Sequence, residues 1–398
     1  MLPSLHRQSS PAVTSAEAEA ERSPHVVMSG YFGFSNLGDE AILEVEVGML
    51  RRAAPNCRIT VLSGNPIETR KSLGVEAVDR LDLFAVWRAL RCADLFLSGG
   101  GSLLQDVTGI GSVPYYLGVT ELARWAGVPR VMLAQGVGPL QRAFSRRLVG
   151  QVVGTMELIT VRDEASARLL ASCGVPSERI TTTVDPVLAM SAVPLEEQVL
   201  EDWGLKPAQP IVAVSLRPWP TWTERELKAF SAVLAQSASA WGAQVLLLPF
   251  HRPDDELLLD ELAQCLAVRP EAQRPHVVCL SHSCSPTQMM GLMARVDLVI
   301  GMRLHALIMA AASATPAVAV VYDPKVKAFA DIAGYPRVES VTDLGNNQRL
   351  ATLLETAWQG RTSRRAALNQ SLPAWRTAAF EPIEQAIGLA TRGRRRVA

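Results

Sequence analysis

Short apolar runs of strand length alternate with longer amphipathic runs of helix length along the chain from residue 25 onward. This alternation predicts repeated strand–helix–strand units, and therefore parallel sheets with helices on their faces. The predicted strands cover residues 26–30, 59–62, 93–97, 130–134, 158–161 and 180–183, followed by 210–216, 243–248, 277–280, 297–300 and 316–321. The amphipathic runs between them predict the connecting helices.

Between residues 185 and 209 prolines and acidic residues replace the apolar pattern, which predicts a domain boundary. The sequence predicts a disordered tail over 1–24, a Rossmann-like domain over 25–190, a second one over 205–345, and helices with a basic tail over 346–398. The expected fold class is α/β, with two doubly wound domains facing each other across a cleft. This is the GT-B-like architecture of many group-transfer enzymes that act on sugars.

Composition narrows the class of protein. The chain of 398 residues is 48% apolar and 20% charged, as in ordinary globular proteins. Its 39 basic and 39 acidic residues balance, so we expect no nucleic-acid partner. Six scattered cysteines, no signal-peptide core and no apolar run of roughly 18 residues predict a cytoplasmic protein. The basic residues 392–396 are either a solvated end or a peripheral contact with the membrane.

Candidate chemistry lies in the loops that follow predicted strands, because these loops share the ligand-binding carboxyl edge of a parallel sheet. In the loop 30–40, Asn36 and Asp39 either contact a ligand or cap the next helix. The loop after the third predicted strand contains Gly99, Gly100, Gly101, Ser102, Gln105 and Asp106. We expect its glycine N–H groups to face a ligand and its last two polar side chains to bind sugar hydroxyls, with a tight turn as the alternative.

In the second half of the chain, arginines and histidines take the corresponding positions. Arg303 and His305 follow the strand 297–300, and Arg217 and His251 follow two earlier strands. Two arginines at neighbouring strand ends suit one carboxylate and one phosphate, unless Arg217 pairs with a nearby glutamate. An arginine beside a histidine here predicts an anionic substrate that needs a proton.

We expect no metal site. His276 and Cys279 have a separation that places them on opposite faces of a strand, so the nearby histidines and cysteines do not predict zinc. No carboxylate pair at glycosidase spacing and no nucleophile elbow stand out, which disfavours hydrolytic functions.

Six motifs together resemble a known family. They cover residues 30–40, 98–106, 134–139, 161–166, 301–305 and 322–325. In this order and spacing they resemble the polysaccharide pyruvyl transferase family, especially bacterial members that pyruvylate cell-wall polysaccharide for S-layer anchoring. The resemblance covers roughly residues 25–335 and neither tail. It implies a two-domain fold with phosphoenolpyruvate as donor substrate, no cofactor, and a saccharide acceptor that is either lipid-linked or polymeric.

The resemblance also implies residue roles. The donor would be held by Arg303, Leu304 and His305 with Arg217, and His251 and Lys325 are further donor-side candidates, although Lys325 can instead pair with Asp323. His305 would protonate the donor's methylene carbon. Asp39 or Asp106 would accept a hydroxyl proton, and the acceptor would meet Asn36, Gly99, Gly100, Gly101, Ser102 and Gln105.

Two other functions compete with this one. The same architecture suits a glycosyltransferase that uses a nucleotide sugar as donor. A non-catalytic protein whose cleft binds glycan, with its basic tail docked on a membrane complex, is the third hypothesis.

Overall fold

Two parallel sheets form the framework of the protein, which we describe from a computed structural model over residues 23–107, 109, 111–220, 222–281 and 284–394. The first sheet has the order β3-β2-β1-β4-β5-β6-β7 and the second the order β10-β9-β8-β11-β12-β13. Both orders reverse direction at one point, between β1 and β4 and between β8 and β11. Ligands of doubly wound sheets bind at the carboxyl ends of the strands at this reversal.

The seven strands of the first sheet are β1 (His25–Ser29), β2 (Arg58–Ser63), β3 (Glu76–Asp79), β4 (Leu95–Ser98), β5 (Arg130–Gln135), β6 (Leu158–Val161) and β7 (Ile180–Thr182). The six strands of the second are β8 (Ile211–Ser215), β9 (Gln244–Leu247), β10 (Val277–Cys279), β11 (Leu298–Gly301), β12 (Ala317–Val320) and β13 (Arg337–Val338). The central strands are buried along their whole length, as expected for sheets covered on both faces.

The helices that follow the strands of the first sheet are α2 (Leu37–Ala53), α3 (Pro66–Leu73), α4 (Leu83–Arg91), α5 (Ser112–Trp125), α6 (Ala143–Val153) and α7 (Glu164–Ser172). Those of the second half are α8 (Glu197–Asp202), α9 (Glu224–Ala240), α10 (Asp254–Ala267), α11 (Pro286–Met293), α12 (Leu304–Ala312), α13 (Pro324–Ala333), α14 (Asn347–Gln359) and α15 (Arg361–Arg394).

Two strands, β3 and β13, lie at sheet edges and are absent from the sequence prediction. β3 has the sequence Glu-Ala-Val-Asp, and β13 is only two residues long. Edge strands need only one apolar face, so their pattern is too short to separate them from loops. The predicted boundary segment 185–209 contains the short helix α8 between β7 and β8.

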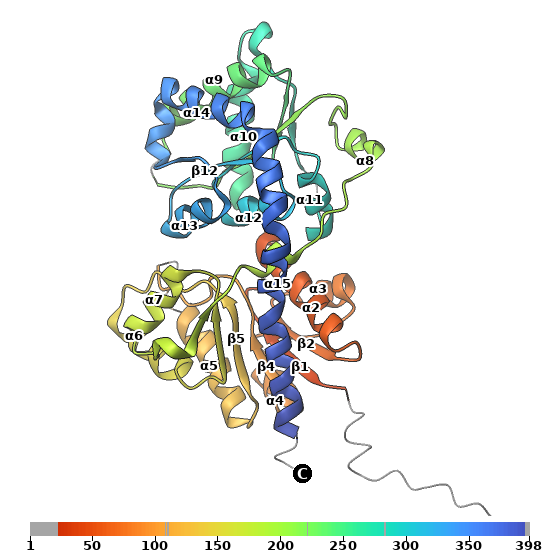
Figure 1. The fold of residues 1–398 in the computed structure, drawn as a ribbon, viewed down its shortest axis with the longest axis vertical. Coiled ribbons are helices and arrows are strands. Elements are labelled where there is room, and N and C mark those ends of the chain that lie inside the picture. The colour runs from red at the N-terminus through yellow and green to blue at the C-terminus, as the bar shows by residue number, and fades with distance from the viewer. Residues whose placement is uncertain (1–22, 108, 110, 221, 282–283, 395–398) are drawn as a thin grey trace, which may run out of the picture.

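The last helix connects the two halves of the molecule. Figure 1 shows α15 running from the upper domain, which contains the second sheet, down along the first sheet. Arg365 donates to the carbonyl of Val296 in the upper half, and Thr183 donates to the carbonyl of Ala378 at 2.5 Å in the lower half. The predicted N-terminal tail lies largely outside the described residues, as does the end of the basic tail. Within the described chain, no helix is both long and apolar enough to cross a bilayer.

Candidate functional site

The two sheets meet through the loops at their carboxyl edges. Asn36, just before α2, forms an isolated antiparallel bridge with His251, and the N–H of Leu37 donates to the carbonyl of Phe250 at 2.9 Å. The Asn36 side chain accepts from the N–H of Gly38 at 3.1 Å and so caps α2. Two segments that the sequence assigns to opposite substrates are therefore joined by backbone hydrogen bonds.

His305 lies at this junction. It occupies the first turn of α12, and its ring packs against Gly38 of the other half so closely that a Cβ there would lie 2.1 Å from Nδ1. The Nε2 atom is buried without a hydrogen-bond partner in the described chain and lies 3.7 Å from a carboxylate oxygen of Asp185. The imidazole is thus held between the two domains, with Nδ1 against Gly38 and Nε2 directed at Asp185.

Asp185 links His305 to Arg162, which follows β6. Arg162 donates to Asp185 at 2.7 Å and to the hydroxyl of Ser102 at 3.0 Å, and both charged side chains are buried. Although burial alone would raise it, His305 and the Arg162 guanidinium hold the pKa of Asp185 well below its usual range. Asp185 is therefore a carboxylate that orients a histidine from one domain and an arginine from the other.

Asp39 faces the same junction from the first turn of α2. Burial raises its pKa, and His305, Arg162 and Lys325 offset this rise only in part. A Cβ on Gly101 would come within 2.7 Å of the Asp39 carboxylate, so the glycine lets the loop approach it. Because its pKa is raised, the ionised Asp39 carboxylate is a stronger proton acceptor than an exposed aspartate.

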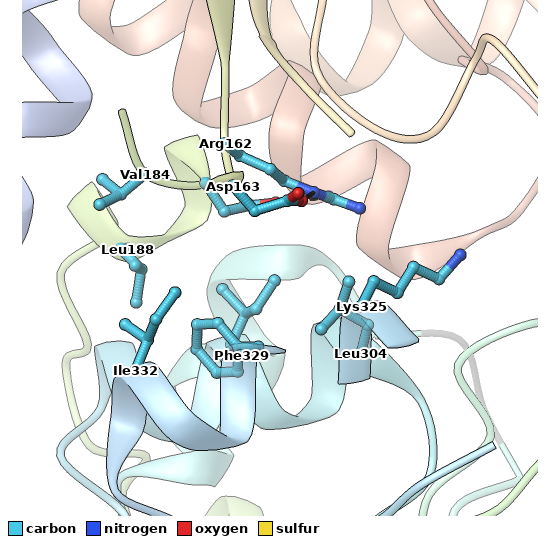
Figure 2. Close-up of a pocket in the computed structure, with 10 residues that line it drawn as sticks. Arg162, Asp163, Val184, Leu188, Leu304, Lys325, Phe329 and Ile332 are labelled. Carbon is cyan, nitrogen blue, oxygen red and sulfur yellow. Dashed lines mark hydrogen bonds and ion pairs between the residues drawn. The ribbon is translucent and has the colours of Figure 1, made fainter. Parts of the chain in front are cut away.

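A pocket opens between the halves beside these residues. Arg162, Asp163 and Asp185 line it from one half, and Leu304, Lys325 and Phe329 from the other. Figure 2 shows the guanidinium of Arg162 and the ammonium of Lys325 extending toward the same side of the pocket. Lys325 also lies 3.8 Å from Asp323, the pairing that the sequence left open. The pocket thus combines two cationic side chains and two carboxylates with an apolar floor.

The two predicted donor-side arginines differ in the structure. Arg303 binds Asp255, which is fully buried, through its Nε at 3.1 and 3.0 Å and through Nη2. Its charge is thus largely neutralised within the protein. Arg217 forms no ion pair in the described chain. Its guanidinium lies 4.8 Å from the ring centre of Tyr322 and donates to the hydroxyl of that residue at 3.1 Å.

The glycine loop after β4 departs from the prediction. The N–H of Gly99 donates to the carbonyl of Ser29 and that of Gly100 to Glu46, both at 2.8 Å, so these groups do not face a ligand. Close packing against α2 explains the glycines, because a Cβ on Gly99 would lie 2.6 Å from Glu46. Burial raises the pKa of Glu46 to about 8, so it is mainly a neutral acid at pH 7.

Asp106 also has a different setting from the one predicted for a proton acceptor. Its two carboxylate oxygens accept the N–H groups of Gln141 and Arg142 at 2.8 and 2.9 Å. Burial opposes ionisation, yet these hydrogen bonds lower its pKa. The Gln105 side chain accepts the N–H of Val107 at 3.0 Å. Asp106 therefore fixes the loop before α6, and this geometry favours Asp39 of the two candidate bases.

Sequence reasoning did not select Arg162, Asp185 and Glu46. Arg162 stands inside a motif that carries the family resemblance, directly after a predicted strand, so its position was a usable signal. Asp185 lies in the segment taken as a domain boundary, where nothing local indicates burial. Among the described residues, no three His, Cys, Asp or Glu side chains group as metal ligands would.

The two doubly wound parallel sheets, which meet at their carboxyl edges, define a two-domain α/β protein of the GT-B type. The structure resembles Staphylococcus aureus MnaA in complex with UDP, with a TM-score of 0.60 at 11% identity over 86% of this chain and 91% of that one. It also resembles Anabaena HepE in complex with UDP, with a TM-score of 0.58 at 13% identity over 92% and 98% of the chains. A Rickettsia africae glycosyltransferase gives 0.60 at 11% identity over 92% and 99%. At this identity the likeness establishes the fold alone.

The family follows from the sequence profile rather than from these structures. The profile of the polysaccharide pyruvyl transferase family matches residues 36–324, most of the chain. The protein belongs to the polysaccharide pyruvyl transferase family. The matched span contains seven of the ten residues that line the interdomain pocket, and the other three, Lys325, Phe329 and Ile332, follow it in α13.

Proposed function

We propose that this protein transfers a pyruvyl group from phosphoenolpyruvate to two hydroxyls of one sugar in a polysaccharide or its precursor, forming a ketal and releasing phosphate. The observation that carries the proposal is the buried His305, whose Nε2 has no hydrogen-bond partner in the described chain and lies between the domains, 3.7 Å from Asp185 of the Arg162–Asp185 pair. Family membership supports pyruvyl transfer in general, and the chemistry of the pocket supports the donor.

The donor is a compact trianion, and the pocket offers it cationic groups. Arg162 and Lys325 line the pocket, and α12 begins there without a side-chain cap, so its first N–H groups add to the favourable field. In this proposal these groups hold the phosphate and carboxylate. Arg303 supports the turn through Asp255, and Arg217 approaches the donor from the side of Tyr322.

Proton transfer completes the reaction. His305, as imidazolium, donates its proton to the methylene carbon of phosphoenolpyruvate, which becomes a methyl group while the adjacent carbon becomes electrophilic. One sugar hydroxyl attacks that carbon and gives its proton to Asp39. Phosphate then leaves, and the second sugar hydroxyl attacks the same carbon to close the ketal, giving its proton to phosphate. Asp39 returns the first hydroxyl proton to His305, which restores the imidazolium. Asp185 stabilises the imidazolium throughout.

The experiment measures phosphate release from phosphoenolpyruvate with a panel of p-nitrophenyl hexosides as acceptors, and identifies the ketal by mass spectrometry. His305→Ala is expected to abolish release. The control is His276→Ala. The His276 ring hydrogen-bonds with the carbonyl of Gly204, and His276 does not line the interdomain pocket. Unchanged turnover in His305→Ala, or no release with any acceptor, contradicts the proposal.

The same preparation separates this function from nucleotide-sugar transfer. The resemblance in fold to UDP-bound proteins makes UDP-glucose the relevant probe. We expect phosphoenolpyruvate, and not UDP-glucose, to raise the melting temperature. A cytoplasmic location belongs to the same proposal, and the six cysteines, none of which forms a disulfide in the described chain, are consistent with it.

A further inference from the structure

A cluster of aromatic rings surrounds Arg80 at the carboxyl edge of the first sheet, outside the pocket described above. We call Tyr31, Phe34, Arg80, Tyr115 and Tyr116 the Arg80 cluster. The Arg80 guanidinium lies 3.9 Å from the ring centre of Tyr115 and 5.2 Å from those of Phe34 and Tyr116. Tyr31 stacks on Phe34 with ring centres 4.4 Å apart.

The charge of Arg80 is not neutralised by the protein. Over the described residues no carboxylate lies within ion-pair distance of it, and its hydrogen-bond acceptor is the hydroxyl of Tyr116 at 3.3 Å. A guanidinium packed on aromatic faces loses water on those faces but keeps its remaining N–H groups for an anion. The cluster therefore has the composition of a site for an oxyanion next to an apolar or ring-shaped group.

The cluster adjoins the proposed acceptor side of the cleft. The hydroxyl of Tyr116 donates to the carbonyl of Gly30 at 3.3 Å, which joins the cluster to the start of the loop 30–40. Phe34 belongs to the loop that leads to Asp39, and Tyr115 and Tyr116 stand in the first turns of α5. A sugar held at Asp39 would have its neighbouring group close to Arg80.

Exposed apolar side chains continue from the cluster. Leu81, Leu83 and Phe84 follow Arg80 directly, and their exposed fractions are 72%, 62% and 75%. Ile67, at the start of α3 after the neighbouring strand β2, is 75% exposed. Three large apolar residues exposed within four positions of an unpaired arginine form an amphiphilic surface rather than scattered surface positions.

We propose that the Arg80 cluster binds the phosphate that joins the acceptor sugar to the rest of the acceptor molecule, with the Tyr31 ring against the sugar. This inference rests on the proposed function, because it takes the sugar at Asp39 as the acceptor. The phosphate belongs either to a lipid-linked glycosyl phosphate or to a phosphodiester in a polymer. The apolar residues 81, 83 and 84 favour the lipid-linked form.

The test measures binding by isothermal titration calorimetry of the full-length protein with N-acetylglucosamine 1-phosphate and with farnesyl phosphate, at saturating phosphoenolpyruvate so that the donor pocket is filled. Arg80→Gln is expected to weaken both ligands at least about tenfold, as loss of a charge-assisted hydrogen bond does. Arg80→Lys separates charge from ring stacking, and circular dichroism confirms folding. The matched control is Arg124→Gln, because Arg124 lies at the far end of α5, where it pairs with Glu121 at 3.3 Å.

The double substitution Leu83→Ser and Phe84→Ser separates the two sources, with Trp125→Ser as its control. If the double variant loses affinity for farnesyl phosphate and keeps its affinity for N-acetylglucosamine 1-phosphate, the acceptor is lipid-linked. If the double variant binds both ligands as tightly as the wild type does, the acceptor is a polymer. Wild-type affinity in Arg80→Gln, or no binding of either phosphate at millimolar concentration, overturns the proposal. Binding of phosphoenolpyruvate is measured separately, so failure of the proposed reaction leaves the Arg80 result readable.

Discussion

The contact between Gly38 and His305 gives a sharp prediction for the Gly38→Ala variant. An ideal Cβ at this position would lie 2.1 Å from Nδ1, 2.4 Å from Cγ and 2.7 Å from Cβ of His305. To restore ordinary contacts the imidazole must retreat by about 1 Å, and a displacement of that size at a reacting group costs roughly 100-fold in rate. We therefore expect turnover to fall about 100-fold, equivalent to about 2.7 kcal/mol in the barrier.

Gly48→Ala provides the matched control, because Gly48 lies in the same helix and a Cβ there meets nothing within 4 Å. Replacing a glycine in a helix interior by alanine stabilises the fold by roughly 0.5–1 kcal/mol, so this variant should keep full activity and melt slightly higher. Phosphate release under saturating donor and differential scanning fluorimetry measure the two effects. Wild-type turnover in Gly38→Ala would refute the assignment of His305 as a precisely positioned proton donor.

Three further substitutions test buried ionisable groups. Asp185→Asn leaves Arg162 buried without its counter-ion, and urea unfolding should show a loss of about 3 kcal/mol. Burial raises the pKa of Glu46 from 4.5 in the unfolded chain to about 8 in the folded one. The contribution of Glu46 to the free energy of unfolding is therefore fully present below about pH 4.5 and decreases as the pH rises toward 8. Wild type should therefore lose stability relative to Glu46→Gln across that interval, and a constant difference would contradict the assignment. Asp255→Ala leaves Arg303 without its counter-ion and should lower both the melting temperature and the rate of phosphate release. A lower rate at an unchanged melting temperature would show that Arg303 does not act by supporting the turn before α12.

The sequence predicts the fold closely, because buried parallel strands read as apolar runs regardless of their partners. Val131 and Ile300 lie within predicted strands, and both are fully buried. The edge strand β3 escapes prediction because Glu76 and Asp79 face solvent at its ends. Local pattern is therefore informative about the centre of each sheet and weak at its margins.

The site is less predictable because its residues act through contacts across the domains. The motif containing Arg303 and His305 indicates an anion site, yet only the structure shows that Arg303 pairs with Asp255 while Arg162 reaches the pocket. Glycines are ambiguous in the same way. Gly99 and Gly100 allow close packing on Glu46, a role that local sequence cannot distinguish from phosphate binding.

Helix α15 has a consequence for how the chain acquires its structure during synthesis. Its second half packs on α2, β4 and β5, and Phe380 lies under the guanidinium of Arg52 at 4.7 Å. The first domain is thus completed by residues that follow the second domain in the sequence. The apolar face of the first domain that α15 covers stays exposed while the second domain is synthesised. N-terminal domains usually finish folding first on the ribosome. Here the domain translated first can be completed only after the second domain has been translated, which makes the intermediate chain a natural client for chaperones.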